Sequence, residues 1–403
     1  MKKILLLTLT CILCFSACNK DEIPSNVDLY GNNPDAFITI WKSDNEGISE
    51  DNQIKIPGYG TDYNIFWEEI GNPTNNGLEQ ATDTHTITFP RNGVYKISIS
   101  GGTTAFNRFQ SDADAKKLIS IEQWGRIKWS SFVRAFAGCE NLEVNANDIP
   151  DLKNVTNMKF MFFRVKEING DVTSWDVSNV TNLTALFTYC KNFNQDVSRW
   201  DVSNVIYMGA VFHGCENFNQ DISSWDVSSV KHMDSMFAST NFNQDISGWD
   251  VSNVTSMYWM FGGTKNFKQD ISGWDVSSVT NMTYLFYDSN FNQDISSWDV
   301  SNVTTMSGMF LGNEDFNQDI SSWDVSNVAS MGWMFGRAKE FNQDISNWNV
   351  SNITDMDNMF HGAENFNQNI SDWNVSNVNE CVDFSKNSGL NPAYLPSLPA
   401  GCD

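Results

Sequence analysis

The feature that most constrains the fold of this chain is a tryptophan that recurs every 24 or 25 residues. The members of this series are Trp175, Trp200, Trp225, Trp249, Trp274, Trp298, Trp323, Trp348 and Trp373. A phenylalanine recurs with the same period from Phe136 to Phe384. A unit this short cannot bury its apolar side chains alone, so it has to stack on its neighbours. The sequence therefore predicts about eleven stacked coils over residues 130–385, the first two of them degenerate.

Within one coil, the spacing of apolar residues changes from that of a strand to that of a helix. In the coil from Ile295 to Phe310, the residues Ile295, Trp298, Val300 and Val303 lie at offsets 0, 3, 5 and 8, which is typical of the strand segment of a leucine-rich repeat. From Val303 to Phe310 the apolar residues follow a helical period. We therefore predict an α+β protein that contains a leucine-rich-repeat-like solenoid, with a parallel β-helix as the alternative.

The region before the repeats has a different pattern. Five short runs of alternating polar and apolar residues, separated by Gly, Pro and Asn, predict a small β-sandwich over residues 35–110. The runs are 36–41, 53–56, 63–67, 84–89 and 94–99. The stretch from Thr84-His85-Thr86 to Gly93-Val94-Tyr95 resembles the end of PKD-type Ig-like domains.

The first residues resemble a lipoprotein signal. Lys2 and Lys3 precede an apolar run, and Ser16-Ala17-Cys18 follows it. This arrangement resembles the bacterial lipobox, which implies that residues 1–18 are a signal peptide and that Cys18 carries lipid. An ordinary signal peptide with an incidental cysteine is the alternative. Lys20-Asp21-Glu22 resembles the signal that directs Bacteroidetes lipoproteins to the outer face of the outer membrane.

Three further segments complete the predicted organisation. Residues 19–34 are expected to be a linker, residues 111–129 a connecting or capping segment, and residues 386–403 a C-terminal cap. A bridge between Cys381 and Cys402 would pin this cap to the last coil. Cys190 and Cys215 fall on adjacent coils, where they could form a disulfide or remain buried free thiols.

Charge and motifs argue against several classes of function. The chain has 25 Lys and Arg against 49 Asp and Glu, a net charge of −24, which disfavours nucleic acid as a partner. It has four histidines, no Gly-x-Ser-x-Gly or His-Glu-x-x-His motif and no phosphate-binding loop. We therefore expect no enzymatic activity, no cofactor and no metal site.

Two ladders of aspartate run through the repeats, one before and one after the ladder tryptophan. The first is Asp171, Asp196, Asp221, Asp245, Asp270, Asp294, Asp319 and Asp344. Stacked carboxylates repel, so they need hydrogen bonds from the backbone or a cation such as Ca²⁺. Asn349, Asn369 and Asn374 replace aspartate without breaking the repeat, which argues against Ca²⁺.

The second acidic ladder is the predicted binding face. It alternates with the inward tryptophan and valine, so it should point to solvent, although a merely solvated surface has the same pattern. Its candidate residues are Ser224, Asp226, Ser228, Asp250, Asp275, Asp299 and Asp324. Tyr258, Trp259 and Trp333 lie off the tryptophan ladder and are candidate contacts for sugar rings.

The recurring string FNQDIS-x-W-DVSNVT-x-M-x-x-MF resembles the 26-residue repeat of bacterial surface proteins, found in BspA-like leucine-rich repeat proteins and mycoplasma surface lipoproteins. The resemblance covers residues 130–385 and implies a secreted or surface-anchored protein. Together with the lipobox-like and Lys20-Asp21-Glu22 segments, it predicts a lipid-anchored, surface-exposed protein of the outer membrane. The resemblance leaves the ligand open; from the exposed Ser and Asp face of the solenoid we expect a non-enzymatic adhesion module that binds a host or bacterial surface protein. A lectin-like module that binds a polysaccharide is the alternative, and exposed aromatic side chains would favour it.

Overall fold

The computed structural model describes residues 33–101, 108–109, 114–400 and 402. The predicted signal peptide and its Cys18 lie outside the described residues.

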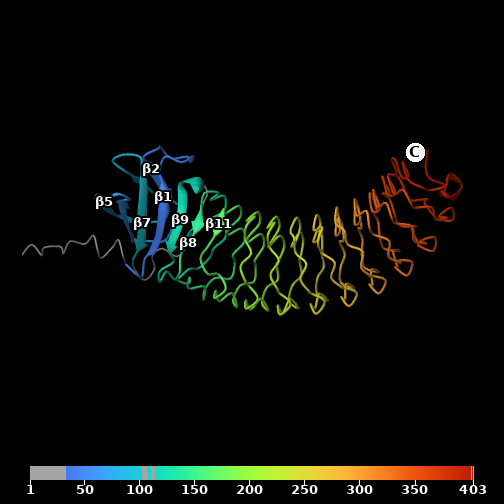
Figure 1. The fold of residues 1–403 in the computed structure, drawn as a ribbon, viewed down its shortest axis with the longest axis horizontal. Helices are drawn as coiled ribbons and strands as arrows, with labels where there is room; N and C mark the ends of the chain where they lie inside the picture. Colours follow the sequence, from blue (N-terminus) through green and yellow to red (C-terminus); the bar gives the residue numbers. More distant parts are fainter. Residues whose placement is uncertain (1–32, 102–107, 110–113, 401, 403) are drawn as a thin grey trace, which may run out of the picture.

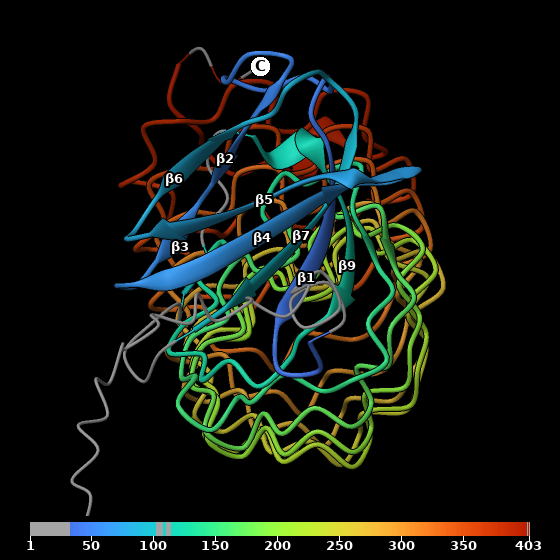
Figure 2. The ribbon, with the colours of Figure 1, turned by 90° about the vertical axis from the view of Figure 1, so that its left-hand side faces the viewer.

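The N-terminal region forms one open, mixed sheet of seven strands in the order β11-β10-β9-β1-β7-β4-β5 (Figure 1). These are β1 (Phe37–Lys42), β4 (Tyr63–Glu69), β5 (Asn72–Ala81), β7 (Val94–Ser100), β9 (Leu118–Gln123), β10 (Glu143–Val144) and β11 (Glu167–Ile168). Two small sheets accompany it, in which β2 (Gln53–Ile56) pairs with β6 (His85–Thr88) and β3 (Gly58–Tyr59) pairs with β8 (Arg108–Phe109). Figure 2 shows these strands in front of the coils.

The sheet passes directly into the repeats. Strand β9 is antiparallel to β1 on one side and parallel to β10 on the other, and β10 is parallel to β11. Beyond β11 each coil joins the next through an isolated parallel bridge, from Asn157↔Asn182 to Asp355↔Glu380. The coils therefore continue the sheet as one stack, which curves away from it in Figure 1.

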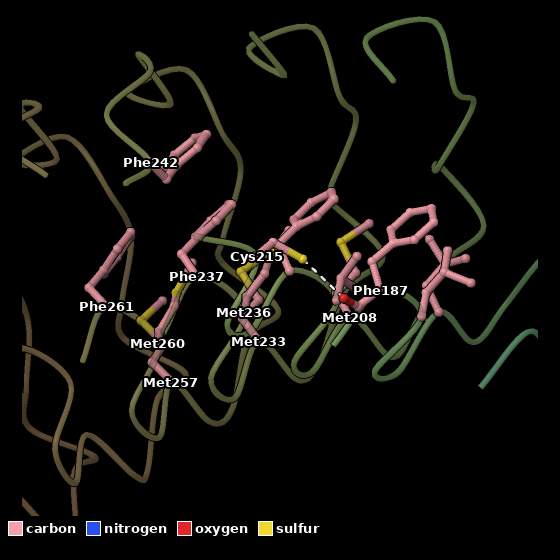
Figure 3. Packing of buried hydrophobic residues seen from close by; sticks show 14 of the residues in the cluster. Phe187, Met208, Cys215, Met233, Met236, Phe237, Phe242, Met257, Met260 and Phe261 are labelled. Atoms are coloured by element: carbon pink, nitrogen blue, oxygen red, sulfur yellow. Dashed lines mark hydrogen bonds between the residues drawn. The ribbon is translucent and has the colours of Figure 1, made fainter. Parts of the chain in front are cut away.

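A single apolar core runs through the sheet and the stack. The ladder tryptophans are buried, and each indole from Trp200 onward donates to a carbonyl of the preceding coil, as Trp200 Nε1 does to Val172 at 2.9 Å. The ladder phenylalanines stack between coils, with the Phe237 and Phe261 ring centres 5.7 Å apart (Figure 3). Both ladders face inward, as predicted, so the tryptophans are not a platform for sugars.

The predicted α+β class with leucine-rich-repeat-like coils is wrong. The part of the chain that the structure describes contains two short 3-10 helices, η1 (Ala115–Lys117) and η2 (Pro392–Tyr394), and no α-helix. The Met-x-x-Met-Phe segment forms successive turns, because residues such as Trp259 (φ 54°) and Gly263 (φ 71°) are left-handed and cannot continue a helix. Alternate N–H groups bond to the next coil instead, for example Trp259 to the Thr283 carbonyl at 2.9 Å, whereas the Met260 N–H donates to the Met257 carbonyl within the turn.

The predicted β-sandwich and the alternative β-helix are also wrong. The N-terminal strands form an open sheet that shares its edge with the repeats rather than two packed sheets. In the stack beyond β11, pairing is reduced to single bridges, so continuous strands do not form there. The five predicted strand runs are present as β1, β2, β4, β6 and β7, whereas β5 was not predicted.

The C-terminal segment covers the last coil. Cys381 and Cys402 form a disulfide, and the Ile370 N–H donates to the Tyr394 carbonyl at 3.1 Å. Cys190 and Cys215 are buried free thiols and do not form a disulfide with each other. Burial raises the pKa of both thiols. Among the described residues, no helix has the length and hydrophobicity needed to cross a bilayer.

Candidate functional site

The aspartates of the predicted binding face form tight turns at the surface of the stack. Asp226 accepts hydrogen bonds from the N–H and the hydroxyl of Ser228 at 3.0 and 2.6 Å. The equivalent aspartates accept an N–H from the serine two residues later in the same way, namely Asp250, Asp275, Asp299 and Asp324. Ser224 belongs to the neighbouring turn and donates to the Ser198 carbonyl at 3.0 Å. Much of the polar capacity of this face is therefore used within the protein.

Asparagine serves the same structural purpose where it replaces aspartate. The Asn349 side-chain oxygen accepts from the Ser351 N–H at 3.3 Å and from its hydroxyl at 2.7 Å. Because a neutral oxygen suffices, capping of turns explains both ladders without a bound cation.

One acidic cluster has a geometry that could hold a metal ion. Oxygen atoms of Asp355, Asp357 and Glu380 lie within 4.8 Å of one another. Asp355 already accepts hydrogen bonds from the Ser330 hydroxyl at 2.6 Å and the Asp357 N–H at 3.0 Å. Asp357 accepts from the Val382 N–H at 2.6 Å. These bonds account for the cluster as part of the turn structure.

The turn before each ladder phenylalanine places one residue in the left-handed conformation. In the coils from Phe136 to Phe360 the residue is two positions before the phenylalanine, and its identity varies widely; in the coil of Phe384 it is Asp383, one position before. The series is Arg134, Phe160, Ala185, Ala210, Ser235, Trp259, Tyr284, Gly308, Trp333 and Asn358, with φ between 54° and 60°. Any side chain other than glycine costs about 1–2 kcal/mol in this conformation. Since the coil forms equally with alanine here, it does not require the large rings of Trp259, Tyr284 and Trp333.

Two of these rings, Trp259 and Tyr284, line a cavity on the outside of the turns. The aromatic groove, as we name it, has a volume of about 370 Å³ and is lined by Tyr258, Trp259, Tyr284, Tyr287 and Leu311. Tyr258 is 36% exposed, and its ring centre lies 6.2 Å from that of Tyr284. The Trp259 and Tyr287 ring centres are 6.5 Å apart. The groove thus presents four aromatic rings from two successive coils and Leu311 from the next coil.

A second cavity of about 300 Å³ adjoins the aromatic groove. It shares Tyr284, Tyr287 and Leu311 with it and adds Trp333 and Arg337. Asp288 also lines it and is paired with Lys265, the charged atoms 2.8 Å apart. Aromatic rings and a few charged groups therefore lie side by side over four coils.

Glycines make room for the rings. A Cβ on Gly308 would overlap the Tyr284 ring, and one on Gly262 would overlap the Trp259 indole. A Cβ on Gly336 would crowd Trp333 in the same manner. The absence of these side chains leaves the rings room close to the backbone of the stack.

The structure brings together some of the predicted site residues but not others. Tyr258 and Trp259 line the aromatic groove and Trp333 lines the adjoining cavity, whereas none of the predicted Ser and Asp residues contributes to either. Sequence reasoning missed Tyr284, Tyr287 and Leu311. Their position in the repeat could have identified them. Tyr284 shares the repeat position of Trp259, and Tyr287 and Leu311 each follow a ladder phenylalanine.

The comparisons with known proteins bear on the repeat stack. No curated protein and no solved structure matches the chain. One family model, described as "Mycoplasma protein of unknown function, DUF285", matches residues 130–241, 222–310 and 288–392. These segments together span more than half of the 403 residues. The chain therefore belongs to the DUF285 family.

Proposed function

We propose that this protein is a non-enzymatic glycan-binding protein of the cell surface, and that the aromatic groove takes the sugar. The observation that carries the proposal is the groove lined by Tyr258, Trp259, Tyr284, Tyr287 and Leu311. Its volume of about 370 Å³ falls in the range of small-molecule sites. The C–H faces of sugar rings pack on aromatic rings, while their hydroxyls bond to polar groups at the edge.

The contacts of the two surfaces favour a glycan bound in the aromatic groove over a protein bound to the Ser and Asp face. The rings are not needed by the coil, because Ala185 and Ala210 occupy the same repeat position as Trp259. The Ser and Asp face predicted to bind a protein has its carboxylates engaged by its own serines.

The cellular location is part of the same proposal and rests on the sequence. The resemblance of Ser16-Ala17-Cys18 to a lipobox and of Lys20-Asp21-Glu22 to an export signal supports an anchor in the outer membrane. A lipid anchor would leave the repeat stack free to meet polysaccharides outside the cell.

A glycan array with matched variants tests the function. Trp259→Ala is compatible with the coil, since alanine already occupies this position in two other coils, and Tyr284→Ala removes a second ring of the groove. We expect each variant to weaken binding about tenfold, the loss of a ring contact worth about 1–2 kcal/mol. Tyr207→Ala is the control, because Tyr207 is 43% exposed but lies outside the groove.

Two results would contradict the proposal. One is saturable glycan binding that Trp259→Ala and Tyr284→Ala leave unchanged. The other is an array without hits, together with capture of a surface protein that Asp226→Asn and Asp250→Asn weaken, which would favour the protein adhesion alternative.

A further inference from the structure

A continuous series of aromatic rings leads away from the aromatic groove along the stack. The ring centres of Trp259 and His213 are 5.3 Å apart, those of His213 and Tyr189 are 4.9 Å apart, and those of Tyr189 and Phe163 are 5.8 Å apart. Phe160 lies 5.7 Å from Phe163. We call Phe160, Phe163, Tyr189, His213 and Trp259 the aromatic track; His213 is buried and joins the neighbouring rings within the stack, so a ligand would meet the other four rings. These contacts show that the track occupies one face of the stack.

The backbone supports the same placement. Phe160 and Trp259 occupy the same repeat position, and a ladder of hydrogen bonds joins the coils at that position. The Phe160 N–H donates to the Thr184 carbonyl at 2.9 Å, and the Ser235 N–H donates to the Tyr258 carbonyl at 2.7 Å. Four coil steps separate the two rings, which corresponds to about 19 Å at about 4.8 Å per step.

The end of the track that lies nearer to the sheet is positively charged. The Lys159 Nζ lies 5.3 Å and the Arg134 guanidinium 6.0 Å from the centre of the Phe160 ring. The Arg164 guanidinium lies 5.2 Å from the Phe163 ring and 5.6 Å from the Tyr189 ring. We call Arg134, Lys159 and Arg164 the cationic end. Such cation–π contacts hold the guanidinium and ammonium groups against the rings and leave their N–H groups available to a ligand.

The cationic end is unusual in a chain whose net charge is −24. Within the described part of the chain, Arg164 has an acidic neighbour, Glu140, with charged atoms 3.9 Å apart. Arg134 and Lys159 form no ion pair with any described residue. Three cations gathered on aromatic rings indicate an anionic ligand, because the rings add stacking to the attraction between charges.

We propose that the aromatic groove, the aromatic track and the cationic end form one extended site for an acidic polysaccharide. This inference rests on the proposed function and names its ligand class. Sugar rings would pack in the groove and along the track, and carboxylate or sulfate groups would pair with Arg134, Lys159 and Arg164. The many acidic groups elsewhere on the chain would repel a nucleic acid or an anionic membrane approaching over a wider area.

Binding of charge-matched oligosaccharides tests the inference. The probes are an oligogalacturonate long enough to span the track, its methyl ester, which has the same rings without charge, and a sulfated oligosaccharide of similar length. The full chain is compared with the triple variant Arg134→Gln/Lys159→Gln/Arg164→Gln and with Trp259→Ala. Lys339→Gln is the control, because Lys339 is paired with Glu314, with charged atoms 2.9 Å apart, outside the track.

We expect one acidic probe to bind about tenfold more tightly than the methyl ester, and more weakly as salt is added. The triple variant should lose this advantage, the control should keep it, and the preference for carboxylate or sulfate identifies the anion. Equal binding of acid and ester that still requires Trp259 would overturn the acidic ligand but leave the glycan function intact. Failure of the glycan array to show any hit that depends on Trp259 would overturn both.

Discussion

The aspartate ladders show how single residues stabilise the stack. Asp294 accepts the Ser296 N–H at 2.9 Å, and its counterparts repeat this bond in coil after coil. The hydrogen bonds from serine lower the pKa of these carboxyls below its usual value. Neighbouring aspartates in the ladder oppose this effect by charge repulsion. The bond from serine dominates, because a hydrogen bond to the charged form favours ionisation.

The lowered pKa of the ladder aspartates predicts that the folded protein loses stability in acid. The folded-state pKa lies below the unfolded value, so the contribution of these aspartates is fully present above the unfolded pKa and is lost as the pH falls through the folded pKa. We expect the free energy of unfolding to fall steeply below about pH 4. Urea unfolding at a series of pH values measures it. Changing ladder aspartates such as Asp294 and Asp319 to Asn should flatten the profile, and an unchanged slope would contradict the assignment.

A buried ladder phenylalanine should matter far more than any exposed aspartate. Phe261 is fully buried and stacks on both Phe237 and Phe286, with ring centres 5.7 and 5.9 Å away. Phe261→Ala should reduce the free energy of unfolding by about 3–5 kcal/mol. Chemical denaturation measures the loss, with Tyr207→Ala as a surface control. A loss below about 1 kcal/mol would mean that the site relaxes around the missing ring.

At the scale of the element, the turns of each coil explain both successes and failures of the sequence reasoning. The inward faces of Trp298, Val300 and Phe310 were predictable, because their spacing recurs in every coil. The helix was not excluded by the sequence, because Met306 and Met309 are three residues apart in a turn as they would be in a helix. The left-handed residues two positions before the ladder phenylalanine carry no signal, since residues as different as alanine, tryptophan, asparagine and glycine occupy that position.

The same limits apply to the sheet and to the candidate site. Strand β5 has the sequence NPTNNGLEQA, which lacks β-branched residues apart from Thr74, and it forms because it pairs with β4. Tyr258, Trp259 and Trp333 were recognised because they fall off the tryptophan ladder. Tyr284 and Tyr287 flank Leu285-Phe286, so the sequence alone made them resemble core residues.

The C-terminal segment gives a prediction at this scale. The Cys381–Cys402 bridge closes a segment with a sequence separation of 21 and holds it on the last coil, where the Phe384 N–H meets the Cys402 carbonyl at 3.3 Å. Cys402→Ser should destabilise this cap by up to about 3 kcal/mol. Amide hydrogen exchange should accelerate first in the final coils and remain slow near Trp249. Uniform acceleration along the chain would show that the coils unfold as one unit instead.

At the scale of the whole molecule, sheet and stack share one core and one run of parallel pairing. Strand β9 pairs with β1 and β10, and so joins the N-terminal sheet to the first coils. The sheet therefore covers the end of the stack that would otherwise expose its apolar interior. The aromatic groove lies several coils away from that junction, whereas the cationic end lies in the first coils beside it, and both are on turns whose backbone is held by bonds between coils.

The proposed anchor is tested on the intact protein in its cell. Cys18→Ser should abolish incorporation of labelled palmitate and release the protein from the membrane fraction, because a thioether to the lipid needs that sulfur. Cys139→Ser is the matched control, since Cys139 is a buried thiol of the stack. Continued labelling of the Cys18 variant would remove the lipoprotein assignment.

The single bridges between coils also determine how the molecule bears mechanical load. A pull along the long axis acts on the coils in series, so tension passes through every junction and the weakest one yields first. Each junction is held by a few backbone hydrogen bonds and by ring stacking such as that of Phe310 on Phe335. A coil that opens releases about 25 residues of slack, about 80–90 Å when extended. The stack would thus lengthen in steps under tension and dissipate part of a suddenly applied force.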